Sequence, residues 1–110
     1  FVSITYVVKG SPIQNDATVD DLRRAGLDGD LGRIITTGLA TPGVMFENAS
    51  REFRSEFEAA DLVLAKGMGY WEGLTEIAPT GKVLHCSMAK CGPVADSMGV
   101  PLNSFVAIMR

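Results

Sequence analysis

The stretch from Ala60 to Glu72 most strongly constrains how this chain can fold. Its residues 62–65 form a short continuous apolar run, which is typical of a strand buried on both faces, as in a parallel sheet. Lys66, Gly67 and Gly69 follow, and a helical pattern begins directly after them. Glycines let backbone N–H groups approach an anion, and the helix start and the lysine both add positive charge. The junction is a candidate phosphate-binding site, although a tight turn with an exposed lysine explains these residues equally well.

Strand-like and helical segments alternate along the whole chain. Runs of β-branched and apolar residues predict strands at 2–8, 33–37, 62–65, 82–87 and 105–109. Helical spacing of apolar residues, together with cap residues such as Thr18 and Ser50, predicts helices at about 19–25, 51–60, 70–77 and 93–98. This order predicts an α/β fold, with a mostly parallel, Rossmann-like three-layer sheet of five strands and helices on both faces.

Length and composition limit the classes of protein to which the chain can belong. Its 110 residues suit a single domain, and 46% hydrophobic residues argue against disorder. The net charge of −3 and the lack of a lysine or arginine cluster give no support for nucleic acid as a partner. No apolar run approaches the roughly 20 residues of a membrane span. Because the sequence opens at Phe1 without an initiator methionine, we expect a fragment of a longer protein or a processed product.

Several weaker signals favour ordinary structural roles. Cys86 and Cys91 are too few for a disulfide framework or a zinc site, so a reducing, cytoplasmic setting is expected. His85 lies in the middle of a predicted strand, and we interpret it as packed and hydrogen-bonded rather than catalytic. Asp28 and Asp30 alternate as in a calcium loop but lack the remaining ligands of that motif.

Polar and glycine residues follow four of the predicted strands. In a sheet of this kind, ligands bind beyond the carboxyl ends of the strands. The residues delivered there are Asn15 and Asp16 after the first strand, Thr37 and Gly38 after the second, Lys66 to Gly69 after the third, and Lys90 and Cys91 after the fourth. Asp16 is a hard oxygen ligand for a divalent cation, and Lys66 and Lys90 suit a phosphate. One carboxylate is few for a metal site, and Asp28 and Asp30 are outside candidates.

Three ordered blocks of the sequence resemble a known family. Gly10-Ser-Pro-Ile-Gln-Asn-Asp-Ala-Thr18 is similar to its Gly-Gly-Pro-Ile-x-Asn-Asp-Ala-Thr motif. Glu52-Phe-Arg-x-x-Phe-Glu-x-Ala-Asp-Leu-Val-x-Ala-Lys-Gly-x-Gly69 resembles its central signature, and Lys90-Cys91 with Pro93-Val-Ala and Gly99-Val-Pro101 resembles its C-terminal block. The family is that of the metal-dependent damage-control phosphatases, first catalogued as domain of unknown function eighty-nine. The match is to its smaller microbial branch and runs from about Phe1 to Arg110.

The resemblance implies an α/β enzyme that uses a divalent metal (manganese, cobalt, nickel or magnesium) to hydrolyse small phosphorylated metabolites such as sugar phosphates. Asp16 matches the aspartate that ligates the metal, and Lys66 matches the lysine that lines the phosphate site; these two are the expected catalytic residues. The expected substrate-binding residues are Asn15, Gly67, Gly69 and Lys90.

Two departures from the family pattern affect this expectation. The family usually supplies an Asp-Asn pair to the metal from an upstream strand, and this chain contains no such motif. We therefore expect residues 1–110 to be the C-terminal part of the protein and to be a poor catalyst alone. Tyr70 also stands where the family commonly has an asparagine, which affects substrate choice or catalysis.

Two other functions are weighed beside the phosphatase. The first is a non-catalytic nucleotide- or sugar-phosphate-binding module, because Gly67-x-Gly69-x-x-x-Gly73 after a strand faintly resembles a dinucleotide fingerprint. The second is an interaction domain that self-associates through an exposed sheet edge of its first strand.

Overall fold

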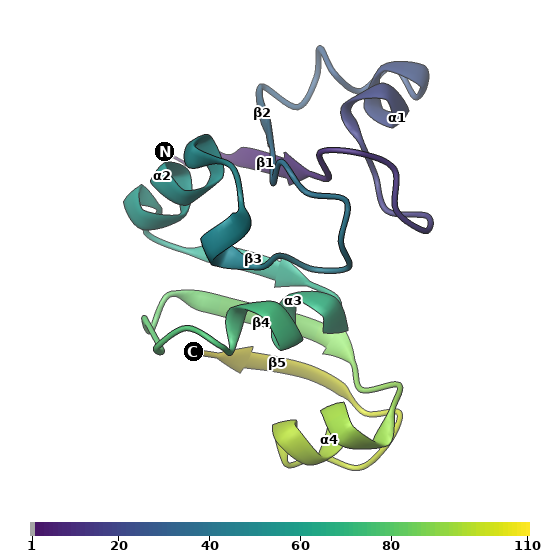
Figure 1. Cartoon of the computed structure of the whole chain (residues 1–110), viewed down its shortest axis with the longest axis vertical. Coiled ribbons are helices and arrows are strands. Elements are labelled where there is room, and N and C mark those ends of the chain that lie inside the picture. Colours follow the sequence, from purple (N-terminus) through teal and green to yellow (C-terminus); the bar gives the residue numbers. More distant parts are fainter. Residues whose placement is uncertain (1) are drawn as a thin grey trace. The chain divides into compact units, whose positions relative to one another are not determined.

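The computed structural model describes residues 2–110 and contains five strands, four α-helices and one short 3-10 helix in this range (Figure 1). Contacts along the chain divide it into two compact units, the first ending at Ala59 and the second beginning at Ala60. None of the described helices has the length and apolar character that a bilayer span requires. The prediction that the chain is one domain stays a prediction.

The N-terminal unit contains a parallel pair of strands. Its elements are β1 (Thr5–Val8), α1 (Val19–Arg24), β2 (Arg33–Thr36), the 3-10 helix η1 (Phe46–Asn48) and α2 (Arg51–Ala59). β1 pairs with β2 in register from Thr5 opposite Arg33 to Val8 opposite Thr36. Because the strands are parallel, the loops that follow them leave from the same edge of this two-stranded sheet.

Side-chain caps fix the starts of both helices in this unit. Thr18 and Asp21 form a reciprocal capping box at the start of α1, which confirms the predicted cap. Ser50 Oγ accepts a hydrogen bond from the N–H of Phe53 at 3.1 Å and donates one to the carbonyl of Thr36 at 2.9 Å. Ser50 therefore starts α2 and also ties this helix to the end of β2.

An aromatic cluster forms the core beneath α2. Phe53 and Phe57 are buried, and Phe46 meets each of them edge to face, with ring centroids 6.2 Å and 5.1 Å apart. Edge-to-face packing is a favoured arrangement of aromatic rings. Phe53 and Phe57 therefore belong to the core of this unit.

The C-terminal unit is a three-stranded sheet with two helices. Its elements are β3 (Val63–Lys66), α3 (Met68–Leu74), β4 (Val83–Met88), α4 (Gly92–Met98) and β5 (Phe105–Met109), with strand order β3-β4-β5. Pro93 lies in the first turn of α4, and Gly99 ends this helix in the left-handed conformation.

The predicted parallel sheet is only partly correct. β3 and β4 are parallel, but β5 runs antiparallel to β4, and the five strands form two sheets rather than one. The reversal follows from the connection after β4. The seven residues of α4 rise about 10 Å, half of the roughly 20 Å spanned by β4. The segment after α4 then folds back at once, because Ala89 and Asn103 are joined by a 2.7 Å backbone hydrogen bond, and β5 begins beside the end of β4.

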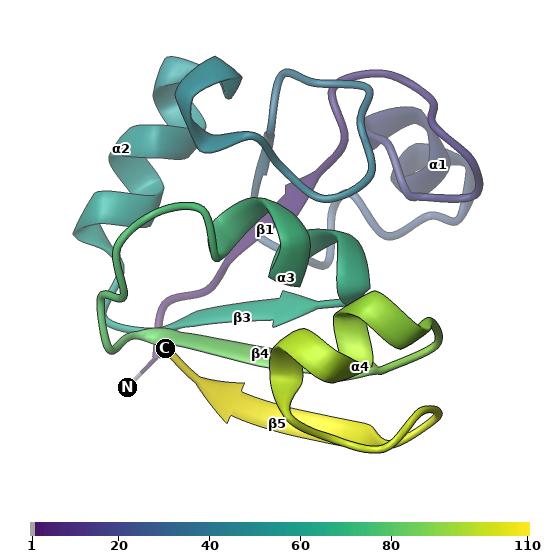
Figure 2. The same cartoon turned by 60° about the horizontal axis from the view of Figure 1, so that its bottom comes forward.

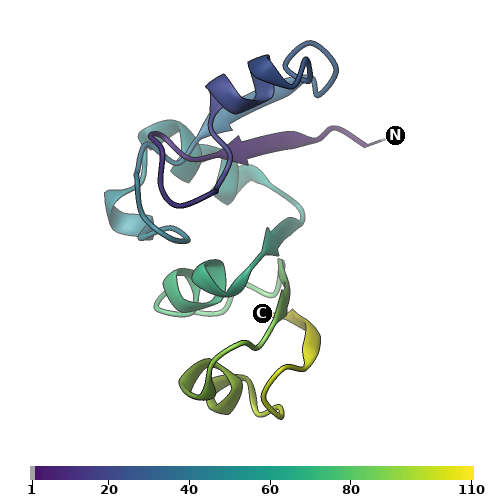
Figure 3. The same ribbon diagram turned by 90° about the vertical axis from the view of Figure 1, so that its right-hand side faces the viewer.

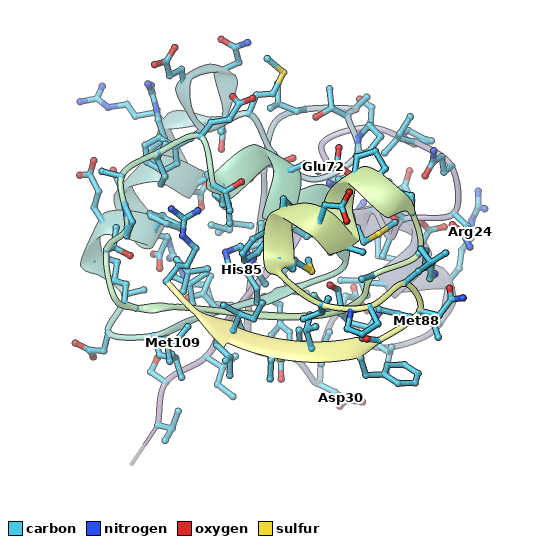
Figure 4. The ribbon with its side chains drawn as sticks, turned by 90° about the horizontal axis from the view of Figure 1, so that it is seen from below. Arg24, Asp30, Glu72, His85, Met88 and Met109 are labelled. Carbon is cyan, nitrogen blue, oxygen red and sulfur yellow. The ribbon has the colours of Figure 1, made fainter. Side chains whose placement is uncertain are left out.

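Both helices of the C-terminal unit cover the same face of its sheet, as Figures 2 and 3 show from two sides. Ala65, Val83 and His85 are buried on this face. On the other face, Leu64 and Phe105 are 67% and 83% exposed, and no described helix of this unit covers them. His85 and Met109 lie on opposite sides of the sheet (Figure 4). The sequence predicts helices on both faces of the sheet. In this unit they are found on one face only.

Candidate active site

The loop after β1 carries Asn15 and Asp16 at its tip. The N–H of Lys9 donates to the carbonyl of Ala17 at 2.9 Å, so the two ends of the loop lie side by side. The N–H of Asp16 donates to the carbonyl of Ile13 at 3.1 Å, which closes a tight turn. Asn15 is exposed and the side chain of Asp16 is 42% exposed. The loop therefore holds two polar side chains in a fixed and accessible turn.

The loop after β2 packs directly against the loop after β1. The N–H of Thr37 donates to the carbonyl of Val8 at 2.9 Å, which extends the strand pairing by one residue. The N–H of Gly10 then donates to the carbonyl of Leu39 at 3.0 Å. The predicted meeting of the residues that follow the first two strands is therefore found within this unit.

A buried lysine links these two loops. The side chain of Lys9 is 3% exposed, and its Nζ donates a hydrogen bond to the carbonyl of Gly43 in the second loop. The same Nζ lies 3.9 Å from Oδ2 of Asp16 in the first loop. Burial lowers the pKa of Lys9 from its ordinary value because it disfavours the ammonium form, while the negative charge of Asp16 acts in the opposite direction.

Asp16 offers one carboxylate to a cation. Oxygen ligands of this kind are the ones that hard divalent cations such as magnesium prefer, so Asp16 fits in chemical type. Among residues 2–110, no group of three or more His, Cys, Asp and Glu could hold a metal ion. Asp28 and Asp30 therefore do not complete a site with Asp16. The part of the chain that the structure describes therefore contains no complete metal site made of these side chains.

The other predicted residues lie in the C-terminal unit, at the carboxyl ends of β3 and β4. Gly67 has φ 109° and ψ 155°, a conformation essentially restricted to glycine, and its N–H donates to the carbonyl of Cys86 at 2.9 Å. The N–H of Lys90 contacts Sδ of Met68 at 3.2 Å, so the backbone of Lys90 meets the first residue of α3. The side chains of Lys66 and Lys90 are exposed. The structure thus brings the lysines and the glycine turn to one edge of this sheet.

The dinucleotide fingerprint is not supported by this geometry. α3 begins at Met68, so Gly69 and Gly73 lie inside the helix and only Gly67 lies in the turn. The helix also has only seven residues.

Asn15 and Asp16 belong to one unit, whereas Lys66, Gly67, Gly69 and Lys90 belong to the other. That the two groups share one active site stays a prediction. Lys9 was not predicted as a site residue, although the sequence holds a signal for it. A Lys-Gly pair follows an apolar segment both at Lys9 and at Lys66, and the sequence alone does not indicate which lysine is buried.

His85 is buried inside the C-terminal unit, on the face of its sheet that α3 and α4 cover (Figure 4). Its ring packs edge to face on Trp71, with centroids 5.1 Å apart, as expected for a packed histidine. Its Nδ1 is buried and, among the described residues, has no hydrogen-bond partner. Burial, and to a lesser extent the charge of Arg110, lowers the pKa of His85. Its packing is confirmed, and the expected hydrogen bond is not found at Nδ1.

Comparisons with known proteins converge on one family. The model of the damage-control phosphatase ARMT1-like domain matches residues 2–106. The chain is 44% identical to an uncharacterized protein of Methanocaldococcus jannaschii over 97% of its length, and 44% identical to a damage-control phosphatase of Pyrococcus horikoshii over 91%. These alignments cover 36% and 34% of the relatives, so the chain spans about a third of their length.

A solved structure agrees with these matches. The crystal structure of a DUF89 family protein from Pyrococcus horikoshii aligns with a TM-score of 0.87 and 42% sequence identity. The alignment covers 96% of this chain and 36% of the other.

Proposed function

Because the chain belongs to the damage-control phosphatase ARMT1-like family, we propose that the intact protein is a metal-dependent phosphatase of small phosphorylated metabolites such as sugar phosphates. The match over residues 2–106 carries this proposal. Since the chain spans about a third of its curated relatives, the activity is proposed for the intact protein, and residues 1–110 alone are expected to be a poor catalyst.

Asp16 is the proposed metal ligand of this chain. It stands at the tip of a loop closed by backbone hydrogen bonds, with its side chain partly accessible. Manganese, cobalt, nickel or magnesium would polarise a phosphoryl oxygen when bound there. Further ligands are proposed to come from the rest of the intact protein, because the described residues contain no group of three or more His, Cys, Asp and Glu that could hold a metal ion. Asn15, beside Asp16 and exposed, is proposed to contact the substrate.

Lys66 and Lys90 are proposed to bind the phosphate oxygens, with Lys66 contributing to catalysis. Both residues are exposed and follow neighbouring parallel strands, β3 and β4, at the same edge of the β3-β4-β5 sheet. An ammonium group is a compact positive charge, and stabilising charge on phosphoryl oxygens is most of the work of phosphoryl transfer. Gly67 forms the turn beside Lys66, and Gly69 lies in the first turn of α3. Both are proposed to let the backbone approach the substrate.

The setting of the protein is proposed to be the cytoplasm, since Cys86 and Cys91 are both free thiols.

The test is an assay of the intact protein. Release of inorganic phosphate from a panel of sugar phosphates and an aryl phosphate is measured with and without manganese or cobalt, for wild type, Asp16→Ala and Asp30→Ala. Asp30 is a matched control, because it is also an exposed loop aspartate in the same unit. We expect cation-dependent turnover that is lost in Asp16→Ala and retained in Asp30→Ala. No turnover by wild type with any cation would overturn the proposal.

A further inference from the structure

We propose that Lys9 is a positioning residue, which holds the carboxylate of Asp16 in one orientation at the tip of the loop after β1. This inference rests on the proposed function, because it takes Asp16 to be a cation ligand. Carboxylates that ligate metals are themselves held by neighbouring groups, which fix their orientation and adjust the affinity of the site. Lys9 supplies such a group from within the chain.

Lys9 is itself fixed at both of its ends. Its backbone N–H is bound to the carbonyl of Ala17 at 2.9 Å, directly beyond β1. Its Nζ is bound to the carbonyl of Gly43 in the loop after β2. A lysine side chain loses its usual rotamer freedom when both ends are tied in this way. The ammonium group therefore stands at a defined place, 3.9 Å from Oδ2 of Asp16.

The charge of Lys9 favours one orientation of Asp16. The attraction between opposite charges is stronger in a buried setting than in water, because there is less screening. Since the side chain of Lys9 is buried, the carboxylate of Asp16 gains by keeping one oxygen toward it. Oδ2 is the carboxylate oxygen that pairs with the Lys9 ammonium, at 3.9 Å.

Lys9 is too deeply buried to bind the substrate directly. With 3% of its side chain exposed, Lys9 offers almost no surface to a phosphate. Lys66 and Lys90, by contrast, are exposed. Lys9 therefore acts through Asp16 and through the packing of the two loops.

Lys9 can change the affinity for a cation in two ways, by repelling it as a positive charge or by positioning Asp16. Removal of Lys9 changes the affinity in opposite directions in the two cases. If Lys9 acted only as a positive charge near the site, its removal would strengthen cation binding, because like charges repel. If it positions Asp16, its removal weakens binding by about 10–100-fold, the usual loss when an outer partner of a metal ligand is removed.

The experiment uses the intact protein with Lys9→Met, Lys9→Gln and, as a control lysine in the other unit, Lys82→Met. Lys9→Gln keeps a donor for the Gly43 carbonyl and removes the charge, so it serves if Lys9→Met fails to fold. Manganese affinity is measured by calorimetry. Amide hydrogen exchange of residues 10–17 is measured without metal, as a readout that does not depend on activity.

We expect weaker manganese binding and faster exchange of residues 10–17 in both Lys9 variants, and neither change in Lys82→Met. Manganese binding that is unchanged or tighter in the Lys9 variants, with unchanged exchange, would overturn the role of Lys9. A wild type that binds no manganese would overturn the metal-dependent function instead, and the exchange measurement would still decide whether Lys9 orders the loop.

Discussion

A Cβ atom on Gly10 would lie 2.6 Å from the carbonyl carbon of Gly38, closer than real Cβ contacts come. Gly10 is thus the position at which the loop after β1 touches the backbone of the loop after β2. The contact sets the separation of the two loops and, through the first of them, the position of Asp16.

Gly10→Ala is expected to destabilise the protein, because backbone atoms rather than a flexible side chain must move. Overpacking of this kind costs about 1–3 kcal/mol of unfolding free energy. Gly29→Ala is the control, since a Cβ there meets nothing within 4 Å. Urea unfolding of both variants checks the prediction, and equal stability of the two would contradict it.

Asp16→Ala is expected to lower the unfolding free energy by about 1 kcal/mol, because Lys9 remains buried and loses a negative partner. The loss is modest since the aspartate is partly exposed to solvent. The same change at Asp30, an exposed loop residue, is expected to stay within about 0.5 kcal/mol of wild type. Thermal unfolding without metal measures both, and a larger loss at Asp30 would argue against the Lys9–Asp16 pair.

Acidification is expected to destabilise the protein through His85. Its pKa in the folded state is lowered, so the unfolded chain binds the proton first. Neutral His85 makes its full contribution to the free energy of unfolding above about pH 6.5, which is the ordinary pKa of histidine. This contribution is lost progressively as the pH falls below that value. The variant His85→Phe keeps an aromatic ring against Trp71, but phenylalanine has no group that binds a proton. Urea unfolding at pH 8, 6 and 5 is expected to show a smaller acid loss in the variant, and parallel curves would refute the assignment.

The open face of the β3-β4-β5 sheet is expected to make the 110-residue chain self-associate, in addition to any pairing along the exposed edge of its first strand. Large apolar patches on a protein surface mark contact sites or aggregation. Leu64→Glu and Phe105→Glu place charges on this face and are expected to reduce the apparent mass in light scattering. Leu102→Glu, at an exposed leucine outside the strands, is the control. A monomeric wild-type chain would contradict the prediction.

Local chemistry made most elements predictable from the sequence. Thr18, Ser50 and Gly99 begin or end helices through hydrogen bonds or backbone conformations that depend on a few adjacent residues. The five predicted strands are all found because apolar and β-branched runs mark them locally, although β1 begins at Thr5 rather than at residue 2. The strand predicted to be buried on both faces leaves Leu64 exposed.

Longer-range features were not predictable in this way. The direction of β5 depends on the return of the chain at Asn103, and the burial of Lys9 depends on a carbonyl of Gly43, far along the chain. Asp16 and Lys66 were recognised from an ordered motif and not from any contact between them, since each belongs to its own unit. A single sequence contains the residue types of a site and only part of the information on which of them meet.

The burial of Lys9 also gives the lysines unequal chemical reactivity. An acetylating reagent acts on amines that reach solvent, so Lys66 and Lys90 are open to it, whereas Lys9 is shielded until the two loops separate. The acetylated fraction of Lys9, read by mass spectrometry, therefore reports how often the loop that carries Asp16 opens.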